Sequence, residues 1–147
     1  MTTFLIVNGP NIEMLGKRDP SHYGTITLAE MEGRIRIHAE KLEVDVLCCQ
    51  SNHEADLVNF INHNSPQSDG IIVNPAGFTL VGYPLLDACI DSSLPVVEVH
   101  LSNIHSREEW RAHSIFSRAV SATVGGMRWM GYIAALEYLT ALIQKEV

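Results

Sequence analysis

Short apolar runs alternate along the chain with longer stretches of mixed polarity. Most of these runs are rich in β-branched side chains, and each ends in turn-forming or polar residues. This pattern is typical of strands that are buried on both faces of a sheet. It predicts five strands, at residues 4–7, 44–49, 71–73, 96–99 and 119–124.

The stretches between the apolar runs predict helices. Thr27 and Glu30 have the spacing of a capping box, and apolar residues then recur at helical period as far as Leu42. The last helix has little polar surface over its first half, so we expect it to be covered on more than one side. The other helices are predicted at residues 52–63, 84–91, 107–112 and 128–145.

Repeated alternation of strand and helix predicts an α/β domain with a parallel sheet. The length favours a single domain over residues 1–147. Five strands at this length favour a flavodoxin-like three-layer sandwich with strand order 2-1-3-4-5. Ligands of such sheets bind beyond the carboxyl ends of the strands, where the strand order reverses.

Composition narrows the classes of partner. The chain has 10 Lys and Arg against 17 Asp and Glu, which argues against binding to nucleic acid. A few well-placed arginines can still hold a small anion. The charged fraction of 18% is below the ~25% usual for soluble domains, which suggests that an oligomer hides part of the surface.

The sequence shows no signal for a membrane span, for secretion or for a disulfide framework. No apolar run approaches the ~18 residues of a membrane span, and no signal peptide is recognisable, so the expected compartment is the cytoplasm. The three cysteines form no CxxC pair and no clear disulfide framework.

Polar residues gather where four of the predicted strands end. Asn and Ser also make good turns, so any one of them has a simpler explanation. Four such clusters at one predicted edge of the sheet nevertheless favour a binding site there. The residues concerned are Asn8, Asn11, Gln50, Ser51, Asn74, His100, Ser102 and Asn103.

The first long loop, residues 8–24, is expected to form a lid over this edge, because loops of this length are usually lids, binding loops or disordered. Arg18 lies five residues before Tyr23 in the loop. A cation near a phenol favours its ionised form, which makes Tyr23 a candidate base. A packed ring with a solvated hydroxyl remains the alternative.

Glu98 and His100 are two residues apart on a predicted strand and therefore point to the same face. A carboxylate beside an imidazole is the usual way to orient a histidine that acts as a general acid. A hydrogen-bonded core histidine is the alternative. Downstream, Arg107 and Arg111 are expected on one face of a short helix.

No metal or cofactor is expected. The spacings between His100, His105 and His113 match no usual pair of zinc ligands. The chain also lacks a P-loop, a GxGxxG fingerprint and a GxSxG elbow, the usual signs of nucleotide binding and serine hydrolysis.

Taken together, several motifs resemble the type II 3-dehydroquinate dehydratase family. They are NGPNIEMLGKRDPSHYG at 8–24, QSNHE at 50–54, NPAGFT at 74–79, EVHLSNIHSREEWRAHS at 98–114 and GYIAALEYL at 131–139. The resemblance implies dehydration of 3-dehydroquinate to 3-dehydroshikimate by anti elimination through an enolate, without metal or cofactor. It also implies a role in aromatic amino-acid biosynthesis or quinate catabolism, and a dodecamer built as a tetramer of trimers.

The resemblance assigns five catalytic residues. Tyr23 matches the base that removes the C2 proton, and Arg18 matches the lid arginine that favours its phenolate. His100, oriented by Glu98, matches the acid that protonates the departing C1 hydroxyl. Asn11 matches the residue that holds a water on the enolate oxygen.

Five further positions match residues that hold the substrate. Leu101 and Ser102 match the positions that bind its carboxylate, through backbone N–H groups and a hydroxyl. Asn74 and Arg111 match residues that hold the ring hydroxyls. Asp87 matches an aspartate that reaches into a neighbouring subunit's site.

One departure concerns substrate binding. Leu80 stands where the family has a histidine that binds substrate hydroxyls, and a leucine neither donates nor accepts hydrogen bonds. Either Tyr83 or a neighbour replaces the histidine, or the chain is a paralogue that binds or transforms another hydroxylated cyclic acid.

Arg107 matches a cation that the family keeps near the site.

Overall fold

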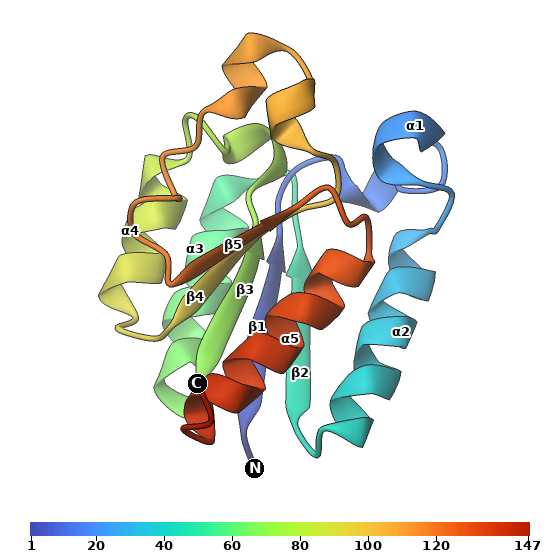
Figure 1. Cartoon of the computed structure of the whole chain (residues 1–147). Coiled ribbons are helices and arrows are strands. Elements are labelled where there is room, and N and C mark those ends of the chain that lie inside the picture. The colour runs from blue at the N-terminus through green and yellow to red at the C-terminus, as the bar shows by residue number, and fades with distance from the viewer.

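A computed structural model describes all 147 residues as one five-stranded parallel sheet between two layers of helices (Figure 1). The strand order is β2-β1-β3-β4-β5, so the predicted α/β fold and order 2-1-3-4-5 are confirmed. The strands are β1 Thr3–Asn8, β2 Asp45–Gln50, β3 Gly70–Asn74, β4 Val96–His100 and β5 Ala122–Gly125.

Helices α2 and α5 cover one face of the sheet, and α3 and α4 cover the other (Figure 1). None of the helices is long and apolar enough to cross a membrane. The α-helices are α1 Pro20–Tyr23, α2 Leu28–Lys41, α3 Glu54–Asn64, α4 Tyr83–Asp91 and α5 Met130–Ile143. Short 3-10 helices are η1 Ile12–Met14, η2 Ser65–Gln67, η3 Ala76–Phe78, η4 Ile104–Ser106 and η5 Glu109–Ala112.

The predicted capping box starts α2. The Thr27 hydroxyl accepts from the Glu30 backbone N–H at 3.2 Å, and the Glu30 carboxylate accepts from the Thr27 N–H at 3.3 Å. Such a cap is worth about 1 kcal/mol. The helix then directs Met31, Ile35 and Ala39 into the core at helical period.

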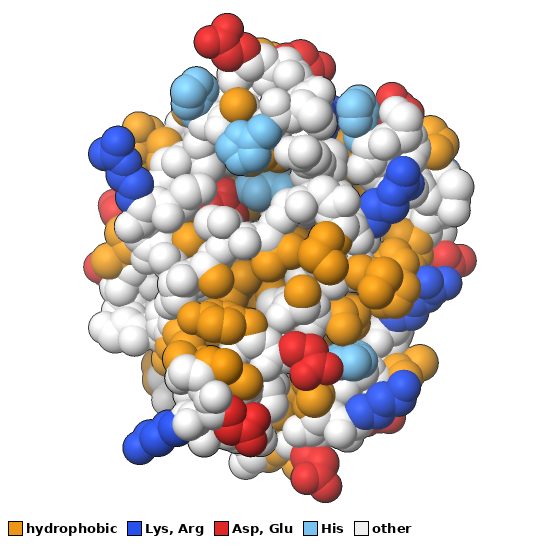
Figure 2. Space-filling view, viewed as in Figure 1, with side chains coloured by type: hydrophobic (Ala, Val, Ile, Leu, Met, Phe, Trp, Pro, Cys, Tyr) orange, Lys and Arg blue, Asp and Glu red, His pale blue; other side chains and the backbone are white.

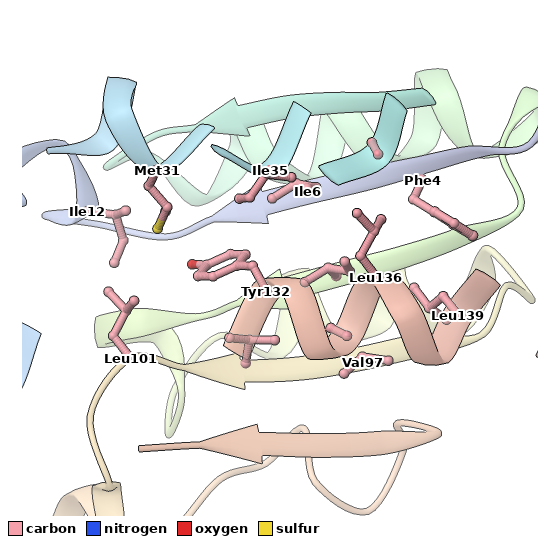
Figure 3. Close-up of a cluster of buried hydrophobic side chains, with 14 of the residues drawn as sticks. Phe4, Ile6, Ile12, Met31, Ile35, Val97, Leu101, Tyr132, Leu136 and Leu139 are labelled. Carbon is pink, nitrogen blue, oxygen red and sulfur yellow. The ribbon is translucent and has the colours of Figure 1, made fainter. Parts of the chain in front are cut away.

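The core between the sheet and helices α2 and α5 extends to the carboxyl ends of the strands (Figure 3). Tyr132 of α5 lies fully buried in it, among Ile6, Ile12 and Leu101, with its hydroxyl directed toward those strand ends. A polar group therefore reaches the functional edge of the sheet from inside the core.

The prediction of strands buried on both faces holds for β1, β3 and β4 and is wrong for β2 and β5. These two strands form the edges of the sheet, and Leu47 of β2 is 43% exposed. The fifth strand is also shorter than its apolar run, because residues 119–121 form the turn that leads into it. The expected helix at 107–112 is the four-residue 3-10 helix η5, and Arg107 precedes it.

Parallel register aligns the polar strand ends. Asn8 pairs with Gln50 of β2 on one side and with Asn74 of β3 on the other. The Gly9 N–H donates to the Asn74 carbonyl at 2.8 Å, and a side chain at Gly9 would clash with the carbonyl oxygen of Pro75. Glycine is therefore required where the chain turns off the sheet toward the site.

Candidate functional site

A cleft opens at the carboxyl ends of the strands, between the segment after β1 and the loops after β3 and β4. Its open space, including the solvent at the mouth, is about 810 Å³. Several histidines lie at this upper end of the molecule (Figure 2). Eight predicted site residues line the cleft: Asn11, Arg18, Tyr23, Asn74, His100, Leu101, Ser102 and Arg111.

The segment expected to be an irregular lid contains two short helices, η1 and α1. Asp19 caps α1, accepting from the Ser21 N–H at 2.9 Å. Hydrogen bonds from Ser21 lower the pKa of the Asp19 carboxyl, so it stays ionised as a cap. The helix ends after Tyr23 because Gly24 adopts φ 75°. Local capping thus fixes the direction of the Tyr23 side chain.

Two guanidinium groups meet at the Tyr23 hydroxyl. Arg18 Nη2 donates to the hydroxyl oxygen at 2.8 Å, and Arg107 Nη1 donates to it at 2.7 Å. The Arg18 guanidinium also stacks 3.9 Å from the centre of the ring. Tyr23 is only 7% exposed. Two positively charged donors therefore meet at one oxygen in a partly buried site, and the second was not expected from the sequence to reach it.

Glu98 and His100 make the contact that their spacing predicts. Glu98 Oε2 lies 2.6 Å from His100 Nε2, and both side chains are buried. Sequence reasoning missed Ser114 and Ser117, whose hydroxyls donate to the same carboxylate at 2.6 and 2.7 Å. Although burial raises the pKa of Glu98, the hydrogen bonds from His100 and both serines outweigh it and hold that pKa below its ordinary value. The anionic carboxylate fixes the imidazole at the cleft.

A buried network orients Asn74. Its Nδ2 donates to the Tyr132 hydroxyl at 2.9 Å, and its Oδ1 accepts from the Ala76 N–H at 3.1 Å. The Tyr132 hydroxyl donates in turn to Asn8 Oδ1 at 2.6 Å. Burial raises the pKa of Tyr132, so its hydroxyl remains a neutral donor. The Asn74 amide has a second N–H that remains free of these contacts.

The QSNHE motif supports the start of the lid segment. Asn52 Oδ1 accepts from the Asn11 N–H at 2.9 Å, and Asn52 Nδ2 donates to Glu13 at 2.6 Å. Asn11 adopts φ 66°, a left-handed conformation that asparagine tolerates better than most residues. Asn52 thus holds the backbone of Asn11 at the cleft that Asn11 lines.

The loop after β4 presents donors for an anion. The backbone N–H groups of Leu101 and Ser102 donate to no acceptor within the chain. Arg107 Nη1 lies 3.2 Å from the Ser102 hydroxyl, which adds a positive charge to the same wall. Adjacent free N–H groups beside a guanidinium form a suitable site for a carboxylate.

The opposite wall carries Leu80, which is 41% exposed at the cleft. Tyr83, which with its neighbours was a candidate to replace the histidine, is 59% exposed and does not line the cleft of its own chain. Trp110 and His113 line it instead, and the Arg111 guanidinium stacks 4.1 Å from the Trp110 ring. No sequence spacing pointed to Trp110.

Asp87 lies exposed on α4 and does not line the cleft of its own chain. Its predicted place in a neighbouring subunit's site therefore stays a prediction. No group of three or more His, Cys, Asp or Glu side chains is arranged to hold a metal ion. The cleft instead combines a phenol between two cations, a carboxylate-bound imidazole and a donor set for an anion.

Comparison with known proteins finds one family over nearly the whole chain. The model of the family "Dehydroquinase class II" matches residues 2–140. A protein of Bacillus pumilus named 3-dehydroquinate dehydratase is 42% identical over 141 residues, 96% of each chain. A catabolic 3-dehydroquinase of Verticillium alfalfae is 41% identical and covers 91% of this chain and 89% of its own.

Solved structures of proteins with related names are also similar to this chain. The type II dehydroquinase of Propionibacterium acnes superposes with a TM-score of 0.92 at 33% identity, covering 96% of this chain and 97% of its own. A 3-dehydroquinate dehydratase-like protein of Bifidobacterium longum has a TM-score of 0.73 at 29% identity, covering 97% and 98%.

Proposed function

Because the chain belongs to the class II dehydroquinase family, we propose that it is a hydro-lyase that converts 3-dehydroquinate to 3-dehydroshikimate. The observation that carries this proposal is the pair of proton-transfer groups at one cleft, Tyr23 between two guanidiniums and His100 on a buried carboxylate. An elimination of water needs one base and one acid, and these two groups supply both.

The base is Tyr23. As phenolate it takes the C2 proton of the substrate, and the electron pair of that C–H bond forms the enolate. Arg18 and Arg107 favour the phenolate, because both donate hydrogen bonds to its oxygen. Asn11 holds the water that donates to the enolate oxygen. The barrier falls because these charges and donors are in place before the enolate forms.

The acid is His100. With Nε2 bound to Glu98, Nδ1 is the ring nitrogen free to give a proton to the C1 hydroxyl. The C1–O bond then breaks, and water leaves as the C1–C2 double bond forms. The products are 3-dehydroshikimate, water, neutral His100 and the Tyr23 phenol, and proton exchange with solvent restores the starting forms. No metal or cofactor takes part in this scheme.

The substrate is held by its carboxylate and its ring hydroxyls. The Leu101 and Ser102 N–H groups and the Ser102 hydroxyl bind the carboxylate, and their lack of acceptors within the chain supports this role. Asn74 and Arg111 bind the hydroxyls. Base and acid then lie on opposite sides of the ring, which gives anti elimination.

A homo-oligomer accounts for the exposed apolar surface of the chain. The family resemblance implies that this oligomer is a dodecamer. The band of hydrophobic side chains in Figure 2 lies over α5 and the loop before it, where Met127 and Met130 are about half exposed. Glu137 is the one charged residue of α5. In such an assembly Asp87 of one subunit reaches the cleft of the next.

The alternative function, that of a paralogue that binds or transforms another hydroxylated cyclic acid, rests on Leu80. With leucine at this position, the wall of the cleft has one polar partner fewer for the substrate. The experiment that decides between the two functions adds 3-dehydroquinate to purified protein and follows the absorbance of the conjugated enone. Growth of the signal in proportion to protein supports the dehydratase. A flat trace at high protein concentration, with a thermal shift on adding substrate, would support the paralogue.

A further inference from the structure

Arg128 connects the two sides of the cleft, although it does not line it. Its backbone N–H donates to the Leu101 carbonyl at 2.9 Å, and its Nη1 donates to the Pro20 carbonyl at 2.8 Å. Pro20 is the first residue of α1, and Tyr23 is the last. One residue thus joins the anion-binding loop to the helix that carries the base.

The segment 18–26 has few other attachments. Its backbone hydrogen bonds stay within the segment, except where Pro20 accepts from Arg128. Among its side chains, only the Tyr23 hydroxyl is bonded from outside, by Arg107. Tyr23 and Ile26 also pack into the core, but segments with so few hydrogen bonds to the protein body open at lower free-energy cost than the regular elements. Loss of either bond should therefore loosen the segment.

The backbone of Arg128 is held in an unfavourable conformation. Its φ of 54° lies in the left-handed region that non-glycine residues rarely adopt. The guanidinium packs closely against Gly24, where a side-chain carbon would lie 3.1 Å from Nη1. Trp129 is fixed by the Arg34 guanidinium, 4.7 Å from its ring. Glycine would suit this turn better, so the arginine side chain needs another reason to be there.

We propose that Arg128 is a positioning residue that latches the Tyr23-bearing helix α1 against the loop after β4. The latch keeps the phenol at its place in the cleft and so acts on proton abstraction. As far as it concerns catalysis, the inference rests on the proposed function. The latch itself is a property of the protein without substrate.

The test is Arg128→Gly, because glycine keeps the Leu101 hydrogen bond, tolerates the backbone conformation and removes only the side chain. Lys145→Gly is the matched control, since Lys145 is a cation with φ 60° at the far end of α5. Amide hydrogen exchange is measured without substrate. The expected result is faster exchange at His22, Tyr23 and Gly24 in Arg128→Gly alone.

Steady-state kinetics follow on the same proteins. In Arg128→Gly we expect kcat to fall about tenfold, since a small misplacement of a reacting group is costly. KM should stay within roughly twofold of the parent value, because Arg128 does not line the cleft. Arg128→Lys keeps one donor and should recover much of kcat.

Unchanged exchange in Arg128→Gly would overturn the latch. So would faster exchange spread over α2 and α5, which would indicate a general loss of stability, or a similar change in Lys145→Gly. If exchange is faster but kcat is parental, the positioning role is refuted. An inactive parent protein would refute the proposed function, while the exchange comparison would still decide whether Arg128 latches α1.

Discussion

Arg107 donates a hydrogen bond of 2.7 Å to the hydroxyl of Tyr23, a residue 84 positions earlier in the chain. The sequence placed Arg18 beside Tyr23 through their short separation, but nothing in it joined Arg107 to the same oxygen. The phenol therefore lies between two cations from different ends of the site. The charge of this pair is central to the proposed ionisation of Tyr23.

Arg107→Met removes one of these two charges while keeping an apolar side chain of similar length. We expect kcat to fall about 100-fold, because the proposed Tyr23 phenolate loses one of its two charged hydrogen-bond donors, and KM to rise because the charge beside Ser102 is also lost. Steady-state kinetics measure both. Arg36→Met is the control, since Arg36 pairs with Glu32 on the surface of α2. A parental kcat in Arg107→Met would remove Arg107 from the mechanism.

Ser117→Ala leaves Glu98 Oε1 without its donor. A buried acceptor that loses its partner costs about 1–3 kcal/mol of unfolding free energy at pH 7. Because the folded-state pKa of Glu98 is lowered, the stability it contributes is present at neutral pH and lost as pH falls through that pKa. The difference between parent and variant should therefore shrink below roughly pH 4.

Denaturant unfolding from pH 3 to pH 7 measures this difference. Ser121→Ala is the control, because Ser121 is exposed and its hydroxyl makes no hydrogen bond. A difference between parent and Ser117→Ala that is constant across this range would show that the serine does not act on an ionised Glu98.

Leu80→His restores a hydrogen-bonding side chain to the wall of the cleft. For a dehydratase we expect KM for 3-dehydroquinate to fall about tenfold, the value of one hydrogen bond to a buried polar group. Val81→His is the control, since Val81 is exposed and does not line the cleft. A higher KM in Leu80→His would indicate that the cleft is shaped for another hydroxylated acid.

Gel filtration tests the assembly. A chain of 16.3 kDa whose last helix carries one charged residue should elute well above the size of a monomer, because helices apolar on all sides are normally covered. Met130→Glu should shift elution toward smaller species. A monomer peak for the parent protein at micromolar concentration would contradict the oligomer.

The fold was largely predictable because it depends on local patterns. The Thr27–Glu30 capping box predicted the start of α2, and the alternation of apolar runs with helical stretches predicted the parallel α/β sheet. The number of strands and the chain length favoured the observed strand order. The predictions failed where tertiary context decides. β2 and β5 lie at the sheet edges and are only half buried, and of the helix expected at residues 107–112 only Glu109–Ala112 is helical, as the 3-10 helix η5.

The candidate site was also predictable only in part. Glu98 and His100 were paired by strand period, and Asn8, Gln50 and Asn74 were gathered by the ends of parallel strands. The partners that orient them come from distant elements. Ser117 reaches Glu98 from 19 residues away, and Tyr132 joins Asn8 across 124 residues. Such contacts follow from packing, and no spacing in the sequence encodes them.

The most direct test of the account compares parent protein with Tyr23→Phe at saturating 3-dehydroquinate. Phenylalanine keeps the ring and its contacts but has no group that accepts a proton. We expect enone formation by the parent and a fall in kcat of about 1000-fold in the variant, with the dissociation constant for 3-dehydroquinate nearly unchanged in calorimetry. Near-parental turnover by Tyr23→Phe would contradict the central claim that Tyr23 is the base.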